Sequence, residues 1–212
     1  MTTIVVRAAS AALFLLAAAT AASAQEAADS AGRARRSTVH LIPSITGTGI
    51  SIVGRDEHVV SAGGASRAYG LAVEVATPLR WVDLRAGVST TRTELEADRD
   101  PDGPRPLGSV SFSTFTLDAV ARGPRLLSFR PYAVLGTGYR YYDFAERGEE
   151  QLTGNHGTFL AHVGAGLAWD VGRYELTLEG GHYYNKLIDS DRLKDADVNN
   201  NTFTVGLRIP IN

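Results

Sequence analysis

Three aspartates have the spacing of a calcium-binding loop. Their segment matches the D-x-D-x-D-G half of such loops and reads Asp98-Arg99-Asp100-Pro101-Asp102-Gly103. Alternating carboxylates before a glycine turn can wrap a hard cation. The twelfth position, where a calcium loop has a bidentate glutamate, is Ser109, and Pro104 and Pro106 stiffen the second half. The pattern therefore favours a solvated acidic loop over a metal site.

Other groups that commonly carry chemistry are sparse in this chain. There is no cysteine, so neither a disulfide nor a thiolate ligand or nucleophile can form. His40, His58, His156 and His162 lack the ligand spacing that brings two imidazoles to one metal ion. No glycine-rich phosphate loop follows a strand and opens a helix. The sequence therefore predicts no metal, no nucleotide and no other cofactor.

The overall composition limits the partners and the fold class. Lys and Arg number 21 and Asp and Glu number 23, a balance that argues against nucleic acid as a partner. Apolar residues make up 44% of the chain, which is typical of a folded protein. The 22 glycines, 8 tyrosines and 7 phenylalanines favour a β-rich fold over a helical bundle.

The start of the chain has the pattern of a secretory signal peptide. One positive charge at Arg7 precedes a short apolar run, and Ala22-Ser23-Ala24 forms an A-x-A cleavage site. The run is shorter and less apolar than the roughly 20 residues that a membrane anchor needs. We expect a cleaved signal peptide over 1–24, a flexible leader over 25–37 and a single folded domain over 38–212.

Beyond residue 38, apolar residues alternate with polar or small ones. In 159–169, for example, Phe159, Val163 and Trp169 share one phase and His162 lies on the other. Alternation predicts strands, because successive side chains of a strand point to opposite faces. No later window holds 18 consecutive apolar residues, which excludes a helical membrane protein. The alternating runs are 38–54, 69–76, 82–90, 110–122, 132–142, 159–169, 174–182 and 203–211.

Two of these eight runs deviate from strict alternation. In the run 110–122, Val110 and Phe112 are out of phase with the rest, which indicates a bulge near Ser113. In the first run the phase slips before Ile50. Both runs still count as strands.

The connections between the runs alternate strictly between long and short. Outer-membrane barrels have this asymmetry, with short periplasmic turns and longer outer loops. The sequence therefore predicts an all-β fold, an eight-stranded antiparallel up-and-down transmembrane β-barrel with both termini periplasmic. The long connections are 55–67, 93–108, 143–156 and 188–200.

Alternation alone does not say which face of the barrel points inward. A soluble lipocalin-like barrel has its apolar face inside. Here glycines gather on the polar face, as a crowded lumen requires, and aromatic residues lie near strand ends, as in the girdles that bracket a bilayer. Both observations favour lipid against the apolar face. The predicted interface aromatics are Tyr69, Trp81, Phe129, Tyr139, Tyr141, Phe159, Trp169, Tyr174, Tyr184 and Phe203.

In this inverted arrangement the polar face lines a closed lumen. Charges removed from water cost several kcal/mol each unless they are paired. An eight-stranded barrel is about filled by its own side chains. We therefore expect a plugged, dry core of structural ion pairs and no aqueous channel. The lumen charge network comprises the acidic residues Glu74, Asp83, Asp118, Glu175 and Glu179 and the basic residues Arg85, Arg122, Arg140 and Arg208.

With these features the chain resembles the small outer-membrane β-barrel family, the OmpA/OmpX-like transmembrane domains of Gram-negative bacteria. The resemblance covers 38–212 and includes the glycine-rich strand PYAVLGTGYRYYDF at 131–144. It implies an outer-membrane location, contact with membrane lipid and lipopolysaccharide, insertion by the barrel-assembly machinery, and a monomer. The chain departs from the family at its end, because Asn212 stands where such barrels usually have an aromatic residue.

Some barrels of this size are enzymes that modify lipid A. The deacylase type has an H-x-S-N motif in which histidine activates serine. The similar run His182-Tyr183-Tyr184-Asn185 has tyrosine at the nucleophile position, so we predict no enzyme. The leading hypothesis is a structural or surface-interaction barrel with four exposed loops. The alternatives are a soluble periplasmic or secreted ligand-binding barrel, a lipid A-modifying enzyme, or a narrow channel.

Overall fold

The computed structural model describes residues 39–53, 58–61, 66–79, 81–97, 105–145, 154–187 and 196–211. These residues contain no helix that is long and apolar enough to cross a membrane. They form nine strands: β1 (Val39–Val53), β2 (His58–Ser61), β3 (Ser66–Ala76), β4 (Val82–Ala97), β5 (Arg105–Arg122), β6 (Phe129–Ala145), β7 (Gly154–Val171), β8 (Tyr174–Leu187) and β9 (Ala196–Ile211).

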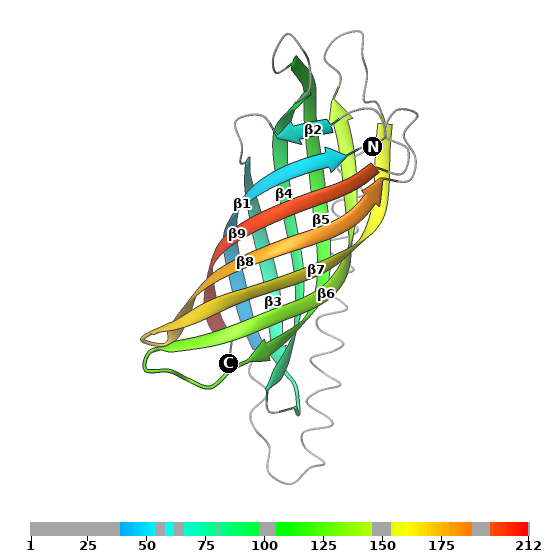
Figure 1. Cartoon of the computed structure of the whole chain (residues 1–212). Helices are drawn as coiled ribbons and strands as arrows, with labels where there is room; N and C mark the ends of the chain where they lie inside the picture. The colour runs from blue at the N-terminus through cyan, green and yellow to red at the C-terminus, as the bar shows by residue number, and fades with distance from the viewer. Residues whose placement is uncertain are drawn as a thin grey trace.

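The strands close into a barrel that has eight strand positions around its wall (Figure 1). From β3 to β9 each strand pairs antiparallel with the next, and β1 pairs with both β3 and β9. The short β2 pairs with β1 and β4, the two neighbours of β3, so β2 and β3 together occupy one strand position of the barrel. The predicted eight-stranded up-and-down barrel is therefore confirmed. We call the end where β7 leads into β8 the turn end, and the opposite end the loop end.

The register of the strands is staggered by ten residues around the barrel, a quantity known as the shear. A row of directly opposed residues leaves β1 at residue 40, passes once around the wall and returns to β1 at residue 50, so the difference is 50 − 40 = 10. This stagger sets the tilt of the strands. In order, the row is His40, Glu74, Arg85, Asp118, Gly136, His162, Tyr183, Asn200 and Ile50.

The polar phase of the strands faces the lumen and the apolar phase faces outward. Glu74 and Asp118 are only 1% and 2% exposed, whereas Leu135 and Phe159 are 69% and 79% exposed. This distribution is the opposite of that in a soluble lipocalin-like barrel, whose aliphatic residues pack inside. The inverted arrangement inferred from the glycines and the strand-end aromatics is the one the barrel has.

The strands extend well into the segments predicted as long loops. β4 continues to Ala97 and β5 begins at Arg105, both within 93–108, and β9 begins at Ala196, within 188–200. The predicted boundaries are wrong because the outward residues become polar there while the backbone ladder continues. Apolar and polar residues alternate only where the outer face of the barrel is apolar. The hydrogen bonds between the strands continue beyond that band.

The bulge predicted near Ser113 is also wrong. β5 pairs with β4 without interruption past this position, and the register shifts only between Leu95 and Glu96. Val110 and Phe112 occupy the inward phase of β5 and are buried. The alternation of inward and outward residues is therefore regular through this part of β5. The inward residues change from polar to apolar there.

The phase slip predicted before Ile50 is wrong for the same reason. Ile50 and Ile52 lie on the buried, inward phase of β1 together with His40 and Thr48. Near the loop end the inner wall changes from polar to apolar, so apolar residues there look out of phase in the sequence. These buried residues form one cluster, the apolar cap: Ile50, Ile52, Leu95, Val110, Phe112, Tyr142 and Val198.

Candidate functional site

Near the turn end of the lumen, two arginines share one carboxylate. Glu74 accepts a hydrogen bond from Arg208 Nε at 2.9 Å and another from Arg122. Arg122 also donates from Nε to Asp83 at 2.6 Å, and Arg208 donates to Glu175. We call these five groups the turn-end cluster. They come from five different strands, so the cluster ties the barrel wall together from the inside.

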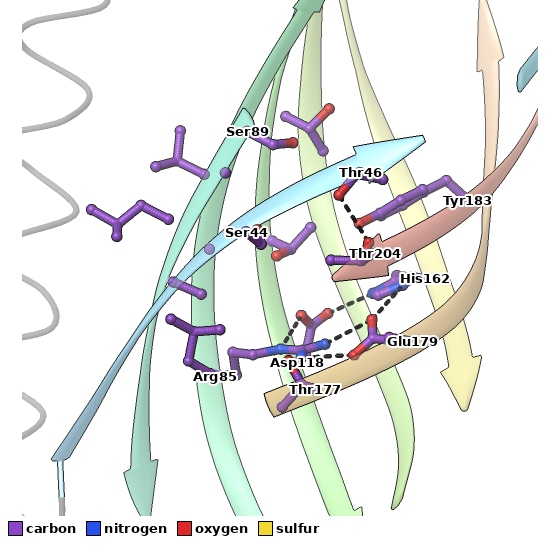
Figure 2. A pocket seen from close by; sticks show the side chains of 18 residues that line it. Ser44, Thr46, Arg85, Ser89, Asp118, His162, Thr177, Glu179, Tyr183 and Thr204 are labelled. Atoms are coloured by element: carbon purple, nitrogen blue, oxygen red, sulfur yellow. Dashed lines mark hydrogen bonds and ion pairs between the residues drawn. The ribbon is translucent and has the colours of Figure 1, made fainter. Parts of the chain in front are cut away.

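A second cluster lies near the middle of the lumen (Figure 2). Arg85 forms a bidentate pair with Glu179 at 2.8 and 3.1 Å, and its Nε lies 3.4 Å from Asp118. The His162 ring lies with Nδ1 3.1 Å from Asp118 and Nε2 3.9 Å from Glu179. Tyr183 stacks on that ring at a centroid distance of 4.2 Å. We call these five side chains the central cluster.

Arg140 belongs to the predicted charge network but has a different environment. Its side chain is buried, and Nε donates to Thr114 at 2.8 Å. Its guanidinium lies over the rings of Phe112 and Tyr183, at 4.8 and 4.9 Å. Within the described residues it forms no ion pair with a carboxylate. Cation–π contacts of this kind, worth up to about 2 kcal/mol when desolvated, replace the expected neutralisation.

A small cavity adjoins the central cluster (Figure 2). Its volume is about 80 Å³, which is room for about two or three water molecules and too little for an organic cofactor. A polar cavity of this size has room for water beside the ion pairs. The cavity wall is rich in hydroxyl groups, contributed by Ser44, Thr46, Ser89, Thr114, Thr116, Thr177, Tyr183 and Thr204.

His162 is a lumen group that the predicted charge network did not include. It is 2% exposed, lines the cavity, and its Nε2 has no hydrogen-bond partner among the described residues. One signal for it was available, because His162 lies on the polar phase of its strand, directly before Gly164 and Gly166 of the same phase. Its contacts with Asp118 and Glu179 depend on the stagger of the barrel, which alternation does not reveal.

Gly136 is required in the row that carries the central cluster. A Cβ at this position would lie 2.0 Å from Asp118 Oδ1 and 2.7 Å from the carbonyl oxygen of Leu117. We expect Gly136→Ala to displace the Asp118 carboxylate and to lower the free energy of unfolding by about 1–3 kcal/mol. Urea unfolding in lipid vesicles, followed by tryptophan fluorescence, measures this loss. The control is Gly180→Ala, since a Cβ there meets nothing within 4 Å; equal losses in both variants would contradict the prediction.

The calcium-loop candidate lies outside the described residues, so Asp98, Asp100 and Asp102 remain a sequence prediction. In the part of the chain that the structure describes, no group of three or more His, Asp or Glu side chains is placed to hold a metal ion.

The run compared with the deacylase motif does not form a nucleophile site. His182 Nδ1 lies 2.7 Å from Asn201 Oδ1, and the His182 ring lies 4.0 Å from the ring of Tyr184. Tyr184 is an exposed outward residue, whereas Tyr183 turns inward to His162. Neighbouring positions of this strand thus face opposite sides of the wall, and the tyrosine at the serine position belongs to the outer surface.

The predicted interface aromatics form two bands on the outer surface. Phe159 and Trp169 lie ten residues apart on the outward phase of β7, which corresponds to about 25 Å along the axis at ~3.3 Å per residue and a ~40° tilt. That height equals the apolar band of a transmembrane barrel. Of the ten predicted aromatics, Tyr141 and Tyr174 are half-buried and the other eight are exposed.

Comparison with known proteins supports the fold. No family model matches the chain, and no curated protein matches its sequence. The outer membrane protein OprG from Pseudomonas aeruginosa has a similar structure, with a TM-score of 0.53 and 10% identity over 82% of this chain and 96% of that one. The outer membrane protein AlkL, determined in lipid bilayers, has a TM-score of 0.51 and 11% identity over 82% of this chain and 90% of that one. The chain therefore has the small outer-membrane β-barrel fold that the sequence resemblance predicted.

Proposed function

We propose that the protein is a monomeric outer-membrane β-barrel with a closed lumen and a structural or surface-interaction role. One observation carries the proposal: aliphatic side chains cover the outside of the barrel while ion pairs fill the inside. Monomeric soluble proteins rarely expose contiguous apolar patches larger than a few hundred Å². The exposed large aliphatic residues of the barrel strands are Ile45, Leu84, Leu117, Leu135, Val163, Leu167, Val171, Leu178, Val205 and Ile211.

The filling of the lumen supports a closed barrel over a channel. The apolar cap lies toward the loop end, and the central and turn-end clusters occupy the lumen below it. An ion crossing the barrel would have to displace both kinds of packing, and desolvating a charge costs several kcal/mol. We therefore expect no steady conductance when the protein is inserted in a planar bilayer.

The side chains that could carry chemistry are engaged in structural contacts, which favours a structural role. Tyr184 replaces the serine of the deacylase motif, and the buried carboxylates of the lumen are bonded to arginine or histidine. The four long connections at the loop end then become the surfaces for contact with lipopolysaccharide or with other cells. The proposed partners are membrane lipid, lipopolysaccharide and the barrel-assembly machinery, and nucleic acid is not among them.

Cell fractionation followed by gel electrophoresis tests this proposal. We expect the protein in the outer-membrane fraction, with a folded band that resists detergent and shifts in mobility only after boiling. Recovery from the soluble periplasm, without detergent, would favour the ligand-binding barrel instead. Single-channel steps or altered lipid A in the same cells would favour the channel or the enzyme.

A further inference from the structure

Two arginines lie side by side on the outer surface where β3 and β4 approach the loop end. The ladder pairs Ala68 with Thr91, and the Thr91 hydroxyl donates to the carbonyl oxygen of Arg67 at 2.6 Å. Arg67 precedes Ala68 and Arg92 follows Thr91, so the two arginines lie on neighbouring strands just beyond the last pair of this ladder. Both side chains are exposed on the outward phase of their strands.

Among the described residues, no carboxylate neutralises this arginine pair. The neighbouring outward positions are Gly47, opposite Arg67 on β1, and Ser111, opposite Arg92 on β5. Glu94 is the next outward residue of β4, and it forms no ion pair with either arginine in the part of the chain described. Like charges that lie close together on neighbouring strands repel each other. An anion bound between the two guanidiniums would relieve this repulsion.

The arginine pair lies at the height of the loop-side aromatic girdle. Arg67 is two residues above Tyr69 on the same face of β3, and Arg92 is the outward residue above Thr90, the partner of Tyr69. Strands β6 and β7 present Tyr139 and other rings in this band, whereas β3 and β4 present guanidinium groups above a single ring. In a transmembrane barrel this band meets the lipid headgroups.

We propose that Arg67 and Arg92 bind a phosphate group of an outer-leaflet lipid, the phosphorylated sugar of lipid A. The inference rests on the proposed membrane insertion. Guanidinium forks match phosphate oxygens in a bidentate manner, so two adjacent forks can clasp one phosphate monoester. Arg92 Nη2 donates to Ser109 Oγ of β5 at 3.2 Å, on the side of β4 away from β3, so this guanidinium must turn toward β3 to share a phosphate with Arg67. The exposed ring of Tyr69 lies below, where it can contact the sugar or the first acyl carbons.

Native mass spectrometry of the detergent-solubilised protein, titrated with bisphosphorylated lipid A, tests the site. We expect the double variant Arg67→Gln/Arg92→Gln to bind this lipid at least tenfold more weakly than the wild type, because both guanidinium forks that donate charge-assisted hydrogen bonds to the phosphate are lost. The matched control is Arg125→Gln/Arg173→Gln, which removes two exposed arginines at the turn end. We expect that control to bind like the wild type. An equal loss in both double variants, or no loss in either, overturns the proposal.

Two further ligands identify the source of the phosphate. Dephosphorylated lipid A is expected to bind wild type and the Arg67/Arg92 variant equally weakly, and tight binding of it by wild type overturns the phosphate assignment. Sodium pyrophosphate alone is expected to bind only weakly, and an affinity equal to that of lipid A would make the ligand a soluble anion and overturn the lipid assignment. All variants are first checked for the heat-modifiable folded band in vesicles. A wild type that fails to insert contradicts the proposed function, whereas insertion without a difference between the variants contradicts this inference alone.

Discussion

Glu74→Gln lowers the free energy of unfolding by about 3–5 kcal/mol, the cost of breaking a buried ion pair from one side. The substitution keeps the size of the side chain and removes the negative charge that both Arg122 and Arg208 contact. Glu74 is 1% exposed, so water cannot reach the two guanidinium groups to solvate them in place of the lost carboxylate. Urea unfolding in lipid vesicles, followed by the fluorescence of the 2 tryptophans, measures the change.

An exposed ion pair of the same chain provides the control. Arg125 and Asp170 lie 2.7 Å apart, and their side chains are 53% and 33% exposed. Asp170→Asn is expected to cost less than about 1 kcal/mol, since exposed pairs contribute little. If Glu74→Gln costs no more than this control, the turn-end cluster does not stabilise the barrel. Adding Arg208→Gln to Glu74→Gln is expected to increase the loss, because it also leaves the Glu175 carboxylate without its arginine.

Leu135→Arg destabilises the protein in a bilayer by about 2–4 kcal/mol, the cost of an arginine near the midplane of a transmembrane barrel. Leu135 is 69% exposed on the outer face of β6, near the middle of the outward run that begins at Phe129 and reaches Tyr139. In a soluble barrel the same substitution on an exposed position would change stability by less than about 0.5 kcal/mol. The measurement is the urea midpoint of folding into vesicles of defined thickness.

Leu127→Arg is the matched control for this substitution. Leu127 is 93% exposed, but it lies in the short connection between β5 and β6, outside the strands. It is expected to tolerate arginine with almost no change, because that connection meets water and headgroups. Equal and small effects of the two substitutions would indicate that no lipid surrounds the strands, and they would favour the soluble alternative.

Alternation was sufficient to predict the number of strands around the barrel, and the glycines of the polar face with the aromatics at strand ends predicted which face points outward. Runs such as 159–169 carry this information locally, because the period of two belongs to the backbone of a single strand. The same reasoning placed the bulge near Ser113 wrongly, since it assumed that an inward residue is polar at every height. Val110 and Phe112 are inward and apolar because they belong to the cap. The strand ends were also missed, because the outward residues there become polar while the strands continue.

The sequence by itself determined the β-barrel class, the number of strands around the barrel, the apolar outer and polar inner faces, and the types of charge that fill the lumen. The tertiary structure alone decided which charges meet, because the contact between Glu74 and Arg208 joins residues 134 positions apart through the ten-residue stagger. It also decided that Arg140 lies against aromatic rings, that His162 joins Asp118 and Glu179, and that a small cavity remains beside them. The physical reason is that polarity is set one strand at a time, whereas contacts across the lumen exist only once the sheet has closed in one register.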